Sequence, residues 1–294
     1  MTVPPVTTGP DEPRVVAGGV DVQLIGVVHL YRQSGSDIVA LRGVDLDVGS
    51  GEMVALLGPS GMGKSTVLRL MAGLMTPSAG MVKVGPHDFG RLSAADRRAL
   101  RAGEISFMVQ GSGTNVLPFA TPLQNIWFAQ HGTRASGKSP PWTPRELLEM
   151  LGIEDIASTP VAALPLGLKQ QVSVAACVAS APRLLLADEP TAQLASAASA
   201  DVVRLFQRIN EALGTTIVIV THDSSVAAMF PRTVTIRDGR VGAEGRLGEE
   251  YAVVDGSGSI QLPPRVLEAL PPNSRVRVIE TPHGVELRKA EAHE

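Results

Sequence analysis

The nine residues GPSGMGKST, at positions 58–66, decide the fold of this chain of 294 residues. They fit the pattern G-x-x-x-x-G-K-[ST], whose defining places are filled by Gly58, Gly63, Lys64 and Ser65. An apolar run, EMVALL, precedes the stretch, and a helical pattern, TVLRLMAGL, follows its lysine and serine. A glycine-rich turn between a buried strand and a helix is typical of a phosphate-binding loop.

The residue types in this loop suit the phosphates of a nucleotide. Glycines let backbone N–H groups wrap phosphate oxygens, and the N-terminus of the following helix favours their negative charge. Lys64 can reach the β and γ phosphates, and the Ser65 hydroxyl can ligate Mg²⁺. The loop therefore predicts binding of ATP with Mg²⁺, through Gly58, Ser60, Gly61, Gly63, Lys64, Ser65 and Thr66.

A second motif, LLLADEP at 184–190, ends an apolar run with two carboxylates. Asp188 is suited to hold Mg²⁺, and Glu189 is suited to polarise a water molecule for attack on the γ phosphate. An acidic pair at the end of a strand is often only a turn. Beside a phosphate-binding loop, however, it becomes the expected metal-binding and catalytic pair.

Strands and helices alternate around these motifs. Apolar runs predict strands at 21–31, 52–58, 104–110, 183–189 and 215–223. Helical patterns lie at 64–71, 93–101, 144–151, 170–179 and 198–213. This alternation predicts an α/β P-loop core with a largely parallel sheet.

The composition favours a globular protein of a reducing compartment. Hydrophobic residues make up 44% of the chain, and the net charge of -3 gives no general attraction to nucleic acid or anionic lipid. The single cysteine, Cys177, excludes an intramolecular disulfide framework and is expected to be a small buried residue. We find neither a signal-peptide pattern nor an apolar run long enough to span a membrane.

Further residues in a fixed order give the chain a family resemblance. Tyr31 lies 27 residues before the first loop glycine, Gln110 ends the run FMVQ, NVLP begins at Asn115, and His222 lies in VTHD. Each could be an ordinary structural residue, but together with the two motifs they resemble the ATP-binding subunits of ABC transporters, over about residues 20–244. NVLP resembles the lipoprotein-releasing, macrolide-export and cell-division branch.

The resemblance implies a site and partners. Tyr31 would stack on adenine, Gln110 would sense the γ phosphate, ligate Mg²⁺ and touch a membrane partner, and His222 would contact the γ phosphate. The implied catalytic residues are Lys64, Glu189 and His222, and the implied metal ligands are Ser65, Gln110 and Asp188. ATPase activity would be coupled to transport, beside a permease on the cytoplasmic face of the cell membrane. An antiparallel β region near the N-terminus and a helical subdomain around residues 146–171 are implied as well.

One motif of the resembled family is altered in this chain. LPLGLKQQV, at 164–172, stands where the family has L-S-G-G-Q, which grips the γ phosphate of ATP bound to the other subunit. Pro165 replaces the serine, Leu166 the first glycine and Leu168 the glutamine, whereas Gly167 is kept. Proline has neither a hydroxyl nor an amide hydrogen, and leucine obstructs close approach of the backbone. The segment is therefore depleted as a phosphate ligand.

Nearby departures point the same way. Ala195 stands where the family's D-loop carries aspartate, and Gln171 and Ala176 replace arginines. The residues that serve the chain's own nucleotide are thus kept, while those lent to the opposite site are not. This predicts a second ATP-binding subunit with an intact signature; the alternative is a homodimer, which is usual in the branch that the chain resembles.

The chain divides into a disordered tail at 1–18, an ATP-binding domain at 19–248 and a small C-terminal module at 249–294. From residue 251 the module loosely resembles the swapped-hairpin half-domain of bacterial transition-state regulators. Five basic residues against four acidic ones at 251–289 leave a charge of about +1, so DNA is not expected as a partner and self-association or partner docking is favoured.

Three functional classes stay open: a motor subunit of a membrane transporter or related complex, a soluble regulator that uses the C-terminal module on DNA, and a nucleotide-binding scaffold that scarcely hydrolyses ATP. The short insertion after Gln110, with NVLP in place of a long helical arm, favours the membrane-coupled class.

Overall fold

The structure is a computed structural model. It describes residues 18–33, 36–111, 114–135, 139–246, 249–254, 258, 260, 262, 264–271, 274–282 and 284–290. Of the tail predicted at 1–18, all but the last residue lie outside the described part.

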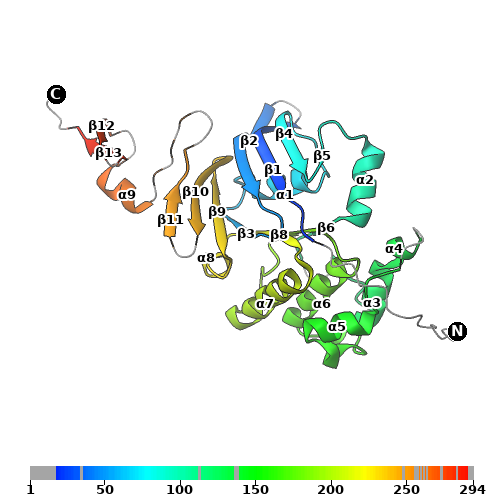
Figure 1. Cartoon of the computed structure of the whole chain (residues 1–294). Helices are drawn as coiled ribbons and strands as arrows, with labels where there is room; N and C mark the ends of the chain where they lie inside the picture. The colour runs from blue at the N-terminus through cyan, green and yellow to red at the C-terminus, as the bar shows by residue number, and fades with distance from the viewer. Residues whose placement is uncertain are drawn as a thin grey trace.

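A sheet of seven strands forms the centre of the molecule (Figure 1). In spatial order they are β11 Glu249–Ala252, β10 Arg240–Arg246, β9 Arg232–Arg237, β3 Met53–Leu57, β8 Thr216–Thr221, β7 Leu184–Asp188 and β6 Ile105–Met108. The strands from β9 to β6 are parallel, and β10 and β11 add an antiparallel edge. This arrangement confirms the predicted α/β core.

The central strands are buried on both faces, which explains why they are continuous apolar runs. In β3, Val54 and Leu56 face one hydrophobic cluster, while Ala55 between them faces the other. Every residue of β7 and β8 is buried. Full burial of a valine, leucine or isoleucine side chain stabilises the fold by about 1.5–3 kcal/mol, so this layer anchors the motifs at its carboxyl edge.

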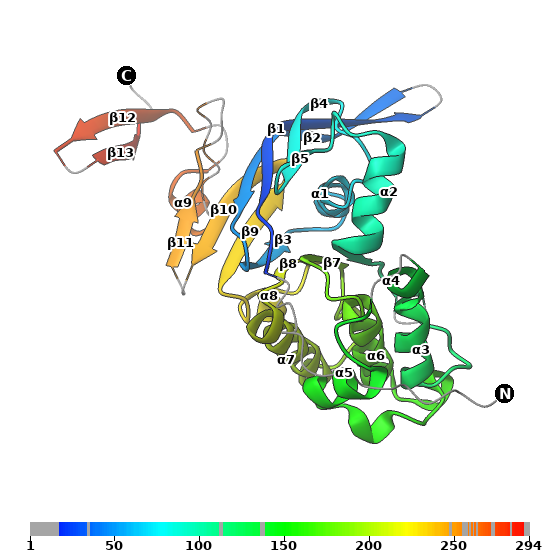
Figure 2. The same ribbon diagram turned by 45° about the vertical axis from the view of Figure 1, so that its right-hand side comes forward.

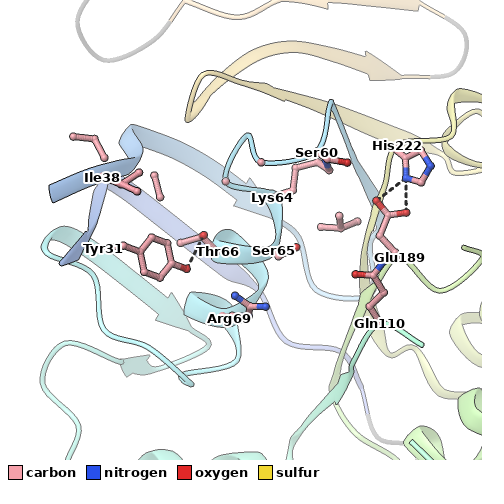
Figure 3. Close-up of a pocket in the computed structure, with 15 residues that line it drawn as sticks. Tyr31, Ile38, Ser60, Lys64, Ser65, Thr66, Arg69, Gln110, Glu189 and His222 are labelled. Carbon is pink, nitrogen blue, oxygen red and sulfur yellow. Dashed lines mark hydrogen bonds and ion pairs between the residues drawn. The ribbon is translucent and has the colours of Figure 1, made fainter. Parts of the chain in front are cut away.

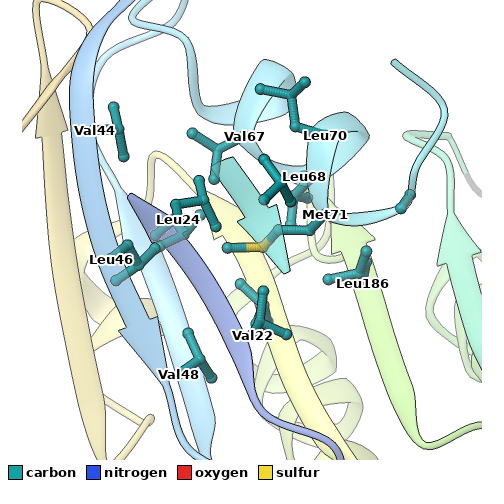
Figure 4. Close-up of a cluster of buried hydrophobic side chains, with 14 of the residues drawn as sticks. Val22, Leu24, Val44, Leu46, Val48, Val67, Leu68, Leu70, Met71 and Leu186 are labelled. Atoms are coloured by element: carbon teal, nitrogen blue, oxygen red, sulfur yellow. The ribbon is translucent and has the colours of Figure 1, made fainter. Parts of the chain in front are cut away.

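A smaller antiparallel sheet covers one face, as expected for the N-terminal region. Its order is β2 Ser36–Val48, β1 Val22–Gln33, β4 Ala79–Val84 and β5 His87–Asp88. Helix α1, Lys64–Met71, lies between the two sheets (Figures 1 and 2). Its Val67, Leu68 and Met71 pack against apolar side chains of β1 and β2 (Figure 4). The helix that follows the phosphate-binding loop is thereby held rigidly on its inner side.

Helices cover the opposite face of the seven-stranded sheet (Figure 2). They are α3 Pro122–Ala129, α5 Pro144–Leu151, α6 Leu166–Val178 and α7 Ser196–Leu213. Capping boxes begin α3 and α5, each with a proline in the first turn, at Thr121 with Gln124 and at Thr143 with Glu146. The remaining α-helices before the C-terminal segment are α2 Ala94–Gly103, α4 His131–Ala135 and α8 Ser224–Ala227 in the described part of the chain.

Helix α6 begins four residues before the predicted start at residue 170, because Leu166 is its first residue. Gly167 lowers the helical propensity of the first turn, so the sequence pattern indicated a helix only from residue 170. The segment 164–172, interpreted above as an altered signature, therefore contains the N-terminus of a helix.

The C-terminal residues extend away from the helical side of the molecule (Figure 1). Strand β11 pairs with β10, and Tyr251 lies opposite Glu244. Helix α9, Pro264–Ala269, precedes a separate hairpin of β12, Val276–Thr281, and β13, Gly284–Lys289. In the described part of the chain, no helix combines the length and apolar character needed to cross a membrane.

Candidate functional site

The predicted phosphate-binding loop runs from the end of β3 to the start of α1. Gly63 is the N-cap of α1 with a φ of 91°, and a Cβ there would lie 2.6 Å from the carbonyl oxygen of Ala40. A Cβ at Gly58 would lie 2.2 Å from the carbonyl oxygen of Ile236. Both positions thus require glycine, because the loop approaches neighbouring backbone too closely for a side chain.

Lys64 is folded back into its own loop. Its Nζ donates to the carbonyl oxygens of Gly58 at 2.6 Å and Pro59 at 2.7 Å. Burial lowers the pKa of its ammonium group below the usual value, and the nearby carboxylates of Glu189 and Asp188 partly offset that effect. The lysine is therefore a buried cation, suited to exchange carbonyl contacts for phosphate oxygens.

The two predicted metal ligands from the separate motifs meet directly. The Ser65 hydroxyl donates to Asp188 Oδ1 over 2.9 Å, and Asp188, at the end of β7, is 5% exposed. Burial raises the pKa of the Asp188 carboxyl, against the lowering effects of the Ser65 hydrogen bond and the Arg69 charge. A hydroxyl and a carboxylate so placed are hard oxygen donors that fit Mg²⁺.

This pair is not a complete protein cage for a metal. Over the described residues, no group of three or more His, Cys, Asp or Glu side chains is placed to hold one. Mg²⁺ usually keeps several waters and is held by one or two protein oxygens together with substrate phosphates. The site therefore fits a Mg²⁺ ion that arrives with a nucleotide.

Glu189 and His222 project from the ends of two adjacent parallel strands. His222 Nδ1 lies 2.9 Å from both Glu189 carboxylate oxygens. The backbone of Glu189 is left-handed, with a φ of 49°, and its N–H donates to the carbonyl oxygen of Val220 at 3.0 Å. A non-glycine residue in this conformation costs about 1–3 kcal/mol, and such strain occurs mainly at functional sites.

Tyr31 forms the opposite wall of the site. Its hydroxyl shares a hydrogen bond of 3.0 Å with Thr66 Oγ1, and it lies 3.7 Å from Met75 Sδ. Ile38 lies directly across from Tyr31 in the pairing of β1 with β2, and the neighbouring Val39 is also exposed. The wall is thus a shelf of one aromatic ring and two aliphatic side chains.

Gln110 lies just beyond β6, on an exposed loop. Asn115, the first residue of NVLP, fastens this loop: its Oδ1 accepts from the Val109 N–H at 3.0 Å, and its Nδ2 donates to the Val109 carbonyl oxygen at 2.8 Å. This anchor directs Gln110 toward the same space as Glu189 (Figure 3).

The predicted residues come together around one cleft of about 490 Å³ (Figure 3). Tyr31, Thr66 and Ser65 lie on one side of the view, and Glu189, His222 and Gln110 on the other. The residues that line the cleft are Tyr31, Ile38, Val39, Ala40, Ser60, Gly61, Gly63, Lys64, Ser65, Thr66, Arg69, Gln110, Glu189, Val220 and His222. Gly58 and Asp188 adjoin it through their hydrogen bonds to Lys64 and Ser65.

Sequence reasoning missed five of the lining residues: Ile38, Val39, Ala40, Arg69 and Val220. Arg69 could have been found, because it lies one helical turn after Ser65 on the same face of α1. The β2 residues could not, because their places depend on the register between β1 and β2, which no local motif specifies.

The segment 164–172, interpreted above as an altered signature, lies outside this cleft. Pro165 is the N-cap of α6, and within the described chain its side chain makes no capping hydrogen bond. The described lining of the cleft includes neither Pro165 nor Leu166. In the described part of the chain, this helix end therefore does not belong to the cleft.

A family model described as ABC transporter matches residues 41–192. The lipoprotein-releasing system ATP-binding protein LolD 2 of Caulobacter vibrioides is 36% identical over 218 residues, which are 74% of this chain and 95% of that protein. The macrolide export ATP-binding/permease protein MacB of Syntrophobacter fumaroxidans is 34% identical over 256 residues. That alignment covers 86% of this chain, which therefore spans 34% of the length of the MacB protein.

Solved structures agree with these similarities. A dimeric post-hydrolysis state of the ATP-binding cassette MJ0796, bound to ADP and Pi, is 31% identical with a TM-score of 0.66, covering 77% of this chain and 98% of that one. The cbiO1 protein of Clostridium perfringens, part of the transporter complex cbiONQ, is 27% identical with a TM-score of 0.66, covering 76% and 88%.

Proposed function

The chain belongs to the ABC transporter family and is one of its ATP-binding, ATP-hydrolysing subunits, and from this premise we propose which of its residues carry the reaction and which partners it works with. The observation that carries the proposal is the convergence of Lys64, the Ser65–Asp188 pair and the Glu189–His222 pair at a single cleft.

The phosphates lie in the loop of Gly58, Ser60, Gly61, Gly63, Lys64, Ser65 and Thr66. Lys64 leaves the carbonyl oxygens that it contacts without ligand and pairs with the β and γ phosphates, where its buried charge is poorly screened. Backbone N–H groups at the start of α1 point toward the same phosphates. Tyr31 stacks on the adenine, supported by the exposed Ile38 beside it.

Ser65, Asp188 and Gln110 are the ligands proposed for Mg²⁺. When bound, the ion neutralises charge on the β and γ phosphate oxygens. Asp188 must be ionised for this role; burial raises the pKa of its carboxyl, and nearby positive charge opposes that effect. The hydrogen bond from Ser65 fixes the orientation of the carboxylate in the meantime.

Glu189 is the proposed general base. It takes a proton from the attacking water as the water oxygen bonds to the γ phosphorus, while the bond from that phosphorus to the β–γ bridging oxygen breaks and releases ADP and phosphate. His222 Nδ1, at 2.9 Å, orients the Glu189 carboxylate, and the imidazole turns its other edge toward the γ phosphate. Gln110 faces the same space from the loop after β6 and senses occupancy of that position.

The metal assignment has a direct test. Ser65→Ala should raise the Mg²⁺ concentration needed for half-maximal ATP hydrolysis by about tenfold or more, because it removes one proposed ligand and releases Asp188 from its hydrogen bond. Ser60→Ala is the matched control, because it removes a hydroxyl from the same loop while keeping the Ser65–Asp188 contact. An equal shift in both variants would remove Ser65 from the metal site.

A membrane permease is the proposed partner, with the chain on the cytoplasmic face of the cell membrane. The similar proteins named above are a releasing-system ATP-binding protein and an ATP-binding/permease protein, which supports this partner. The surface around α3 supports it too, because Phe119, Trp127 and Phe128 are 79%, 55% and 59% exposed. Large exposed aromatic side chains are typical of a protein interface.

A second ATP-binding subunit is proposed to complete the site. Dimers of similar cassettes support the pairing as such. At the N-terminus of α6, Pro165 offers no hydroxyl, Leu166 is partly exposed, and Ala195, the N-cap of α7, makes no side-chain cap within the described chain. We propose a different subunit with an intact signature as the preferred partner, so that the site facing Pro165 turns over slowly.

The rival is a homodimer in which the N-terminus of α6 suffices to bind phosphate. The double substitution Pro165→Ser and Leu166→Gly separates the two arrangements. If the purified chain alone hydrolyses ATP slowly and the rebuilt signature accelerates it severalfold, the native segment limits a homodimeric site. Robust ATPase activity of the unmodified chain alone would remove the need for a second kind of subunit.

We propose that residues 249–294 form a module for self-association beside an ATP-binding domain at 19–248, and that the module is joined to this domain by β11, which pairs with β10 in the central sheet. An isolated two-stranded hairpin is marginally stable in water, yet Val278 and Val285 on one face of β12 and β13 are 63% and 66% exposed. On this face, Glu280 of β12 lies at one end and Lys289 of β13 at the other. When two copies pack face to face about a two-fold axis perpendicular to the strands, the glutamate of each copy meets the lysine of the other. The near-neutral charge of the segment gives less support to a regulator that binds DNA.

A further inference from the structure

His29 is a buried, titratable residue that the proposed reaction does not use. It lies on β1, two residues before Tyr31, and is 7% exposed. Its Nδ1 atom is buried and has no hydrogen-bond partner among the residues that the structure describes. Burying an unpaired polar atom destabilises a fold, so a histidine at this place calls for an explanation beyond core packing.

The contact between His29 and Tyr31 supplies this explanation. Their ring centroids are 4.9 Å apart and their planes meet at 83°, which is an edge-to-face arrangement. Aromatic pairs in this geometry attract one another beyond the effect of apolar burial, and their energy depends on the angle between the rings. The histidine therefore constrains the plane of the tyrosine ring as well as its position.

A second contact fixes the far end of the same ring. The Tyr31 hydroxyl bonds to Thr66 Oγ1 at 3.0 Å, which connects β1 to helix α1 of the phosphate-binding loop. With His29 against the ring and Thr66 at its tip, the tyrosine is held while it still lines the cleft beside Ile38. An ordered ring loses less conformational entropy when a flat ligand stacks on it than a mobile one does.

We propose that His29 is a positioning residue for the nucleobase: it holds Tyr31 in the orientation that stacks on adenine, and so increases affinity for the base without touching the nucleotide. The inference rests on the stacking role proposed above for Tyr31. The proposal predicts that the effect of His29 is confined to ligands that carry a base, because the aromatic contact of His29 is with the Tyr31 ring.

The test compares ATP with inorganic tripolyphosphate, which lacks a base, by titration calorimetry on the full chain. His29→Ala is expected to weaken ATP binding by about two- to tenfold, the range that corresponds to loss of an aromatic pair, and to leave tripolyphosphate binding unchanged. His29→Phe keeps an aromatic ring and is expected to restore ATP affinity to within about twofold of the wild type. In steady state, His29→Ala should raise KM for ATP with kcat unchanged.

A double-mutant cycle with Tyr31→Ala completes the design. If His29 acts through Tyr31, adding His29→Ala to Tyr31→Ala should cost no further ATP affinity. Equal losses for ATP and tripolyphosphate, or additive losses in the cycle, would overturn the inference. His29→Leu fills much of the same volume without an aromatic edge, so it repeats the test should His29→Ala fail to fold.

The stacking role of Tyr31 and the positioning role of His29 can be refuted separately. Unchanged ATP affinity in Tyr31→Ala would refute the stacking role itself. A loss of affinity in Tyr31→Ala with none in either His29→Ala or His29→Leu would leave the stacking role intact and refute the positioning role of His29.

Discussion

Two glycines of the phosphate-binding loop provide a matched test of the loop geometry. Gly61 and Gly63 both have left-handed backbones, with φ of 81° and 91°. A Cβ at Gly63 would lie 2.6 Å from the Ala40 carbonyl oxygen and 2.7 Å from Leu41 Cδ2, whereas one at Gly61 would meet no described heavy atom within 4 Å. Substitution by alanine therefore adds the same backbone strain at both positions but a clash at one alone.

The expected losses of stability follow from the backbone strain and from the clash. A left-handed alanine costs about 1–2 kcal/mol at either position. Overpacking at Gly63 adds about 1–3 kcal/mol, because the obstacle includes backbone that has no rotamer to change. Gly61→Ala should lower the free energy of unfolding by about 1–2 kcal/mol, and Gly63→Ala by about 2–5 kcal/mol.

Urea denaturation followed by circular dichroism gives both values by linear extrapolation. Ala40 has no direct partner in β1, since His29 pairs with Leu41 and Leu30 with Val39, and its carbonyl oxygen lies against the loop. Equal losses of stability in the two variants, or a larger loss for Gly61→Ala, would refute this close approach of β2 to the loop.

Three further predictions concern other parts of the chain. Lys64→Ala should weaken ATP binding by about 100-fold or more through loss of a charge-assisted phosphate contact, and Tyr31→Ala should weaken it by about tenfold or less. Equal ATP affinities of the wild type and Lys64→Ala in calorimetry would contradict the phosphate site. Glu280→Lys should weaken self-association of the full chain at low salt, and adding Lys289→Glu should restore it; sedimentation showing no recovery would refute the proposed two-fold pairing. Cys177 is partly buried against the helical core, less than the sequence suggested, and desolvation raises the pKa of its thiol to about 11 from 9.0. The folded chain therefore holds that proton more tightly than the unfolded chain, so stability is full below about pH 9 and falls toward about pH 11. Cys177→Ala should show a shallower fall in urea titrations, and identical slopes would contradict the desolvation.

The fold could be predicted from the sequence where the local residue pattern of an element matches its burial. The strands β3, β7 and β8 are buried on both faces, so their composition alone identified them, and α1 and α5 occupy the ranges that their patterns predicted. Strand β2 was not among the predicted strands. It alternates between buried Val44 and Leu46 and charged residues on its outer face, and it contains a bulge, so no continuous apolar run marks it.

The site was readable for a different reason. Its charged residues lie in motifs of fixed spacing that follow buried strands, and parallel strands bring their carboxyl ends to one edge of the sheet. The aliphatic shelf of Ile38 and Val39 and the buried contact of His29 with Tyr31 depend on strand register and side-chain packing. Such relations appear only when the chain is folded, because residues of any apolar or aromatic type can fill them.

The central claim is that Glu189 at this cleft activates water for ATP hydrolysis, and Glu189→Gln tests it most directly. Glutamine keeps the shape of the side chain and can still bond to His222, but it cannot accept the proton of the attacking water. Phosphate release should be measured on the chain purified from cell membranes together with its partners. ATP binding should be measured on the same sample. Glu189→Gln should bind ATP with an affinity within about threefold of the wild type and should release phosphate at least about 100-fold more slowly; hydrolysis at the wild-type rate would contradict the role of Glu189 as the general base.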